Sequence, residues 1–135
     1  MWIVDTCVVL DVLEYDPAFG RPSAELLHQL LPQGLAVSPV TMVELSAALG
    51  GDLAEQKRFL DLAGIAYIEP WTATDTEHAH TAWHAYVAAK RLGKAAKKPV
   101  ADILIGAFAA NRTGLVTRNA RDFTRWFPTL KVREP

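Results

Sequence analysis

"VADILIGAFAANRTGLVTRNARDF", residues 100–123, predicts a helix, a strand and a loop in direct succession. Residues 100–114 form a long apolar segment of helical length, and Asp102 lies in its first turn. "LVT", residues 115–117, has the composition of a short buried strand. A loop with several arginines follows, and it contains Asp122. The stretch therefore predicts one carboxylate at the start of a helix and a second one just after a strand.

The same alternation of strands and helices extends through the rest of the chain. Short apolar runs predict further strands at residues 1–4, 35–39, 65–69 and 130–132. Segments with helical spacing of apolar residues predict helices at residues 6–14, 23–32, 40–51, 52–64 and 74–93. Thr6, Ser23 and Asp52 are the expected caps. This order predicts an α/β fold, with a mainly parallel central sheet of four to five strands flanked by helices.

Length and composition favour a single compact domain that spans residues 1–135. Half of the residues are apolar, yet no uncharged apolar stretch is long enough for a transmembrane helix. The start "MWIVD" lacks the basic region of a signal peptide. Cys7 is the only cysteine, which excludes an internal disulfide and fits a reducing cytoplasm. We therefore expect a cytoplasmic protein.

Charge is distributed unevenly along the chain, although the formal net charge is only −1. Residues 1–89 contain 3 Lys and Arg and 12 Asp and Glu, whereas residues 90–135 contain 11 and 3. This asymmetry favours an acidic site beside a basic surface that could hold a polyanion. Chance segregation of solvated surface charges is the alternative.

Four carboxylates from separate segments are expected at one edge of the sheet. Asp5 and Asp122 follow predicted strands, whereas Glu44 and Asp102 lie near the starts of predicted helices. In an open parallel α/β sheet, the carboxyl ends of the strands and the N-termini of the helices share one edge, where ligands bind. Taken singly, each acid could equally be a turn residue, a residue at a helix N-terminus or an exposed helix residue.

Clustered carboxylates repel one another, and a divalent cation removes the conflict. A set of oxygen ligands alone suits Mg²⁺ or Mn²⁺ better than zinc. Such an ion can polarise a phosphodiester and activate a water molecule. The sequence therefore favours a metal-dependent hydrolase, and the basic half of the chain favours a polyanionic substrate over a small molecule.

Four short motifs resemble those of the PIN-domain ribonucleases, in the same order along the chain. They are "IVDT" (residues 3–6), "VTMVEL" (40–45), "VADILIGAFA" (100–109) and "LVTRNARDF" (115–123). The small size and the ending "TRNARDF" resemble most closely the VapC-type toxins of toxin–antitoxin pairs. The resemblance covers nearly the whole chain and implies a single PIN-like domain.

The resemblance implies a catalytic and metal-binding pocket made of Asp5, Glu44, Asp102 and Asp122. It implies supporting roles for Thr6, Thr117 and Asn119. It also implies Mg²⁺ or Mn²⁺ as cofactor, RNA as substrate, a homodimer, and inhibition by a cognate antitoxin protein. Cys7 departs from the small polar residue that relatives often have there.

Arg118 and Arg121 flank the expected pocket in sequence, which favours contacts with RNA phosphates. Arg112 and Lys131 are expected to be solvent-exposed surface charges. Two further functions stay open at this point. One is a housekeeping nuclease without an antitoxin, and the other is a non-catalytic PIN-fold module that binds RNA or protein.

Overall fold

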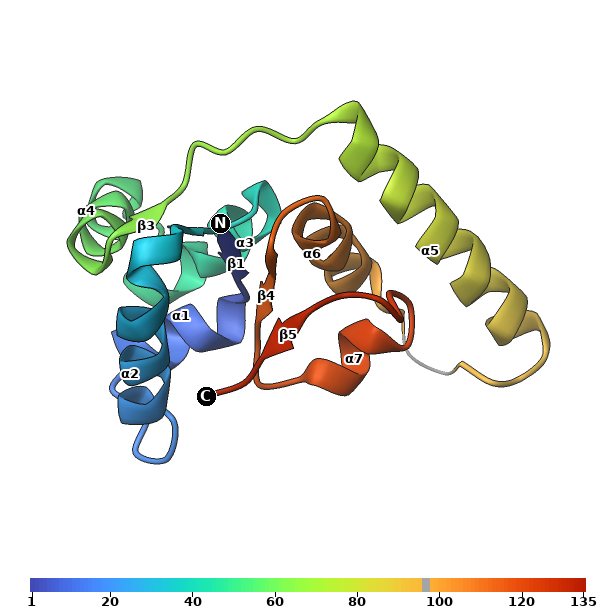
Figure 1. Cartoon of the computed structure of the whole chain (residues 1–135). Helices are drawn as coiled ribbons and strands as arrows, with labels where there is room; N and C mark the ends of the chain where they lie inside the picture. Colours follow the sequence, from blue (N-terminus) through green and yellow to red (C-terminus); the bar gives the residue numbers. More distant parts are fainter. Residues whose placement is uncertain (96–97) are drawn as a thin grey trace.

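The computed structural model describes residues 1–95 and 98–135, and in these residues five strands form one sheet (Figure 1). The strands are β1 (Trp2–Val4), β2 (Leu35–Ala36), β3 (Ile65–Ala66), β4 (Gly114–Val116) and β5 (Val132–Arg133). Their order is β3-β2-β1-β4-β5, and every neighbouring pair is parallel. The predicted α/β class with a parallel central sheet is confirmed. Ala96 and Lys97, part of the basic connector around residues 94–99, lie outside the described residues.

The helices fall close to their predicted positions. They are α1 (Thr6–Leu13), α2 (Gly20–Leu30), α3 (Pro39–Glu44), α4 (Leu53–Ala63), α5 (Ala73–Arg91), α6 (Val100–Ala110) and α7 (Ala120–Thr124). Short 3₁₀ turns, η1 (Leu31–Gln33) and η2 (Leu45–Leu49), follow α2 and α3. None of the helices in the described ranges has both the length and the apolar character needed to cross a membrane.

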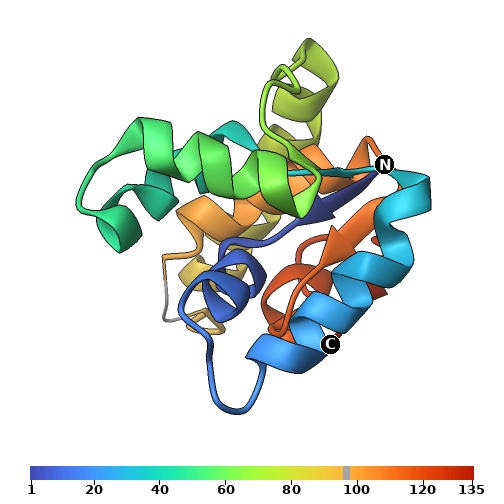
Figure 2. The same ribbon diagram turned by 90° about the vertical axis from the view of Figure 1, so that its left-hand side faces the viewer.

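The central strand β1 shows how the sheet separates two helical layers. Trp2 and Val4 point into a core shared with α1, α2 and α4. Ile3 points to the other face, where it packs with apolar residues of α6 and α7. Figure 2, viewed from the side of α1 and α2, shows these helices in front of the sheet. The long helix α5 does not reach the sheet but packs on the outer side of α6 (Figure 1).

Two of the three predicted helix caps need correction. The side chain of Asp5, not that of Thr6, caps α1, because Asp5 ends β1 with extended backbone and accepts the Thr6 N–H. Asp52 caps α4 as predicted. Ser23 lies inside α2, which begins earlier, and its hydroxyl donates a hydrogen bond to Asp11 instead. The pattern of apolar residues predicted the helices correctly but not where the second one begins.

Gly106 has the packing role that its place in an apolar helix suggests. A Cβ atom at this position would overlap the ring of Phe127, which follows α7. The close neighbour of Gly106 is therefore an aromatic side chain from the C-terminal segment.

Arg112 is not the exposed surface charge that the sequence suggested. Its side chain is 7% exposed, and its Nη1 donates to Oδ1 of Asp75 at 3.0 Å. The guanidinium also lies over the ring of Phe108, 3.5 Å from the centroid, and pairs with Glu69 at 3.3 Å. Arg112 therefore fastens the end of α6 to the start of α5, which nothing in local sequence indicates.

Candidate active site

Asp5 occupies the carboxyl end of β1, at the edge where parallel α/β sheets bind ligands. Its backbone N–H bonds the carbonyl of Val116, the last residue of the neighbouring strand β4, at 2.9 Å. The residue is only 6% exposed. The fold therefore buries a carboxylate between the ends of two central strands.

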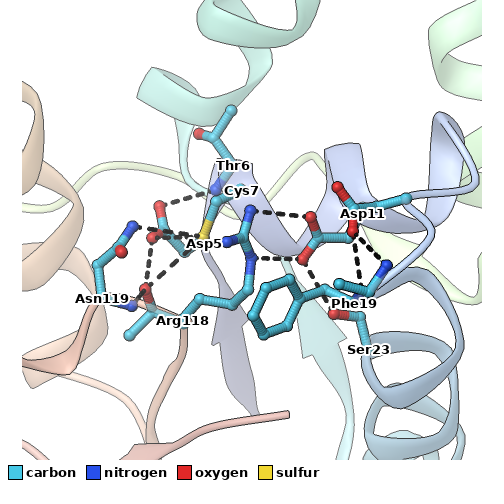
Figure 3. A network of polar contacts seen from close by, with 11 residues as sticks. Asp5, Thr6, Cys7, Asp11, Phe19, Ser23, Arg118 and Asn119 are labelled. Atoms are coloured by element: carbon cyan, nitrogen blue, oxygen red, sulfur yellow. Dashed lines mark hydrogen bonds and ion pairs between the residues drawn. The ribbon is translucent and has the colours of Figure 1, made fainter.

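Three neighbouring groups donate hydrogen bonds to the Asp5 carboxylate (Figure 3). The hydroxyl of the buried Thr117 donates to Oδ2 at 2.6 Å, and the Thr6 N–H donates to Oδ1 at 2.8 Å. The Cys7 thiol lies 3.3 Å from Oδ2. These donors come from the segments that follow β1 and β4, and they fix the orientation of the carboxylate.

Burial raises the pKa of Asp5 above its usual value, because a charged carboxylate loses its hydration there. The negative charge of Glu44 acts in the same direction, whereas the bonds from Thr117, Cys7 and Thr6 oppose it. The site thus holds an acid whose ionised form would gain from a nearby cation.

Glu44 is linked to Asp5 through one threonine. The Thr6 hydroxyl donates to Oε1 of Glu44 at 2.6 Å, while the Thr6 N–H binds Asp5. Glu44 is the last residue of α3, whose start is capped by Ser38 through the Thr41 N–H. The exposed Glu44 side chain thereby joins the same sheet edge as Asp5.

Asp102 and Asp122 form a second pair. Asp102 lies in the first turn of α6 and Asp122 in the first turn of α7, and both line a cleft of about 240 Å³. Its walls also include Ala95, Pro99, Arg121, Arg125 and Trp126. The helix α6, which carries Asp102, also packs against α3, which carries Glu44.

The chemistry of these donors fits a hard divalent cation, but the acids form two pairs and not one cluster. Within residues 1–95 and 98–135, no three His, Cys, Asp or Glu side chains are close enough to form a metal site by themselves. Mg²⁺ commonly needs only one or two protein carboxylates, because water and substrate phosphates complete its shell. The Asp5–Glu44 and Asp102–Asp122 pairs suit such binding, and their role as metal ligands stays a prediction.

Of the residues expected to support the site, Thr6 and Thr117 bond Asp5 directly, and Asn119 contacts two neighbours of Asp5. The Asn119 N–H donates to Oγ1 of Thr117 at 3.0 Å, and its Nδ2 lies 3.9 Å from the sulfur of Cys7. Burial, helped by the charge of Asp5, raises the pKa of Cys7 to about 11. At neutral pH the thiol is therefore protonated, so it can donate to Asp5 and is a poor nucleophile.

Arg118 and Arg121 have different surroundings. Arg121 is exposed and lines the cleft beside Asp102 and Asp122. The guanidinium of Arg118 pairs with Asp11 of α1, with Nε 2.7 Å from Oδ2 and Nη2 2.9 Å from Oδ1. Of the two arginines, only Arg121 has the position that the sequence suggested for contact with substrate.

Asp11 is the residue of this region that sequence reasoning missed. It is not among the site residues that the sequence predicts, yet it is 3% exposed. Its oxygens accept bonds from Arg118 and from the Ser23 hydroxyl. One signal was available: Asp11 lies three residues after Val8, on the same buried face of α1.

Comparison with known proteins gives a family and two similar folds. The sequence profile of the PIN domain matches residues 2–126. A chain in the crystal structure of VapBC2 from Rickettsia felis, bound to a DNA fragment from their promoter, superposes with a TM-score of 0.69 at 18% identity. That match covers 98% of this chain and 97% of the other. A chain of VapBC-1 from nontypeable Haemophilus influenzae gives the same TM-score and identity, covering 98% and 96%. No curated protein matches the chain in sequence.

Proposed function

This chain belongs to the PIN-domain family, and on that premise we propose that it is a metal-dependent endoribonuclease, the toxin of a VapBC-type pair. The reaction is hydrolysis of RNA phosphodiester bonds, with Mg²⁺ or Mn²⁺ as cofactor. The observation that carries this proposal is the buried Asp5 carboxylate at the sheet edge, 2.6 Å from the Thr117 hydroxyl and linked through Thr6 to Glu44. Capping of α1 needs only the bond from the Thr6 N–H to Asp5, whereas the link through Thr6 to a second carboxylate is additional and favours cation binding.

The proposed ligands are Asp5 and Glu44 together with Asp102 and Asp122, which line the cleft. A divalent ion bound there would supply an activated water and stabilise the negative charge that develops on phosphate oxygens. Thr6 and Thr117 orient the Asp5 carboxylate through bonds of 2.8 and 2.6 Å. These bonds leave Asp5 little freedom to rotate, which favours a fixed ligand geometry.

Positive charge beside the acids would bind the substrate backbone. Arg121 and Arg125 line the same cleft as Asp102 and Asp122. Arg125 also lies over the ring of Trp126, 4.6 Å from the centroid. The cleft thus offers cations for phosphates and an aromatic wall for a base, the combination typical of single-stranded nucleic-acid sites.

Two protein partners belong to the proposal, a cognate antitoxin and a second copy of this chain. Support for the antitoxin is that both similar structures are of VapBC pairs. Support for a homodimer is an apolar hollow between α5 and α6, of about 510 Å³, which includes the half-exposed Trp83 and Val100. A hollow of this composition is a candidate protein contact.

Single amide substitutions test the catalytic part of the proposal. Asp5→Asn and Asp102→Asn should each lower the cleavage rate of a labelled single-stranded RNA by roughly 100-fold or more, since each removes charge that holds the cation. Glu25→Gln is the matched control, because Glu25 is an exposed carboxylate whose ion pair within the described residues is with Arg21 on α2. Cleavage in Mg²⁺ or Mn²⁺, and its loss with EDTA, completes the assay.

Retention of the parent rate by either amide variant would show that the acids are not the catalytic groups. Expression with and without the neighbouring gene separates the biological roles. Growth arrest relieved by that gene indicates a toxin with its antitoxin, whereas RNA cleavage without arrest indicates a housekeeping nuclease. A protein that binds RNA in Mg²⁺ or Mn²⁺ but never cuts it is the non-catalytic module.

A further inference from the structure

The loop between β4 and α7 is attached to α1 at two points. At the first point, the Thr117 hydroxyl bonds Asp5, which caps the start of α1, at 2.6 Å. At the second point, Arg118 forms two bonds with Asp11, at 2.7 and 2.9 Å. Asp5 and Asp11 are six residues apart along α1, a separation of about 9 Å. Two attachments this far apart fix both the position and the orientation of the loop.

The surroundings of Arg118 favour this attachment over contact with RNA. Asp11 is 3% exposed and also accepts the Ser23 hydroxyl of α2 at 3.1 Å. The face of the guanidinium lies over the ring of Phe19, 4.3 Å from the centroid. Figure 3 shows the Arg118 side chain directed toward Asp11, on the side away from Asn119. Both the edge and one face of the group are therefore occupied within the protein.

The loop that Arg118 holds carries groups of the candidate site. Thr117 bonds Asp5, the Asn119 N–H bonds Thr117, and Asp122 follows in the first turn of α7. A shift of this loop would move Thr117 and Asp122 relative to Asp5. Misplacement of catalytic groups by about 1 Å can lower a rate by roughly 100-fold.

We propose that Arg118 is a positioning residue, which through Asp11 holds the loop after β4 in register with Asp5. This inference rests on the proposed nuclease function and assigns Arg118 a role other than binding RNA phosphates. It predicts an effect on turnover and none on substrate affinity.

A double-mutant cycle tests this role. Arg118→Gln, Asp11→Asn and the double variant should each lower kcat by roughly 10- to 100-fold, by nearly the same factor, because all three remove the same attachment. KM for a 20-nucleotide single-stranded RNA, and the dependence of its binding on salt, should stay within about twofold of the parent. Arg118→Lys should not restore kcat, since lysine cannot form the paired bonds of a guanidinium. All rates are compared well below the melting temperature of each variant.

Two matched controls accompany the cycle. Arg58→Gln removes an arginine of the exposed Arg58–Glu55 pair on α4 and should change neither kcat nor KM. Arg121→Gln, in the cleft, should raise KM and weaken the salt dependence. Arg118→Gln could instead raise KM and weaken the salt dependence as Arg121→Gln does, with Arg118→Lys keeping the parent values. In that case Arg118 binds RNA and the inference is wrong. It is equally wrong if Asp11→Asn keeps the parent kcat.

Hydrogen exchange gives a readout that does not depend on cleavage. Arg118→Gln should speed exchange of the amides at residues 117–119 without affecting those of α4, because the loop loses its second attachment. Unchanged exchange in this loop would overturn the inference. If the parent protein cuts no RNA at all, the nuclease proposal fails, while the exchange experiment still decides whether Arg118 holds the loop.

Discussion

Two arginines flank strand β4, and they form similar pairs at its opposite ends. Arg112 precedes the strand and pairs with Asp75 of α5, whereas Arg118 follows it and pairs with Asp11 of α1. Each guanidinium lies over a phenylalanine ring, and each aspartate is buried. The same arrangement of arginine, buried aspartate and phenylalanine ring thus occurs at the amino and carboxyl edges of the sheet.

The two pairs differ in the other groups that their arginines contact. Arg112 also bonds the carbonyl groups of Pro70 and Phe108, and it contacts none of the candidate catalytic acids in the described residues. Its side chain is 7% exposed, compared with 29% for Arg118, which adjoins Thr117 of the site. Chemistry in parallel α/β sheets concentrates at the carboxyl edge. We therefore expect the Arg112–Asp75 pair to maintain stability and the Arg118–Asp11 pair to maintain geometry.

The largest effect should come from breaking the amino-edge pair. Asp75→Asn removes the fully buried partner of Arg112 and leaves it the more exposed Glu69, 3.3 Å away, so the free energy of unfolding should fall by about 3 kcal/mol, the lower end for a broken buried pair. Urea unfolding at pH 7 measures the change. Cleavage per folded molecule should match the parent at low temperature. A loss of turnover in fully folded Asp75→Asn protein would remove the distinction between the two pairs.

Breaking the carboxyl-edge pair should affect stability less. In Asp11→Asn, the partly exposed Arg118 can turn toward water, so the expected loss is about 1–3 kcal/mol for one disturbed buried acceptor. The same urea experiment gives the value, with Arg21→Ala in the exposed Arg21–Glu25 pair as a control expected to change stability by less than about 1 kcal/mol. A loss as large as that of Asp75→Asn would mean that both pairs are mainly structural.

Substitution of Asp5 should have the opposite effect on stability, because burial of its charged form outweighs the three hydrogen bonds that stabilise it. Its pKa is raised by burial, so the folded protein favours the protonated acid. That contribution is present at acidic pH and is lost as pH rises through the raised pKa. Without divalent ions, Asp5→Asn should therefore be more stable than the parent at pH 7, with a smaller difference near pH 3.

Thermal melting across this pH range measures the Asp5 effect. Addition of Mn²⁺ should raise the melting temperature of the parent more than that of Asp5→Asn, since the variant lacks a proposed ligand. A parent more stable than Asp5→Asn at pH 7 in EDTA would contradict the direction of the effect.

The smallest expected effect is a local loosening of the loop after β4, and the reactivity of the Cys7 thiol measures it. With a pKa of about 11, the Cys7 thiol should react with iodoacetamide at pH 8 about 100-fold more slowly than an unfolded cysteine. Arg118→Gln should raise this rate several-fold by loosening the loop beside Cys7, whereas Asp75→Asn should not, below its melting temperature. Equal rates in both variants would show that the carboxyl edge does not depend on Arg118.

Sequence reasoning predicted neither of the two ion pairs at the ends of β4. The sequence predicts Arg112 on the surface and gives Asp11 no role, because each is charged and its partner is remote in sequence. Asp75 and Asp11 are separated from their arginines by 37 and 107 residues. Contacts at such distances leave no local trace in propensity or periodicity. Asp11 alone had a signal, from its place on the buried face of α1 with Val8.

The sequence by itself determined the alternation of strands and helices, the parallel sheet and the placing of four carboxylates at element ends. These follow from periodicity and from the rule that parallel strands end at one edge. Only the tertiary structure decided that the acids lie as two pairs, that Thr6 links Asp5 to Glu44, and that Arg118 faces Asp11. Side-chain partners depend on burial and on donor geometry between segments that meet only after folding, so the order of residues alone cannot specify them.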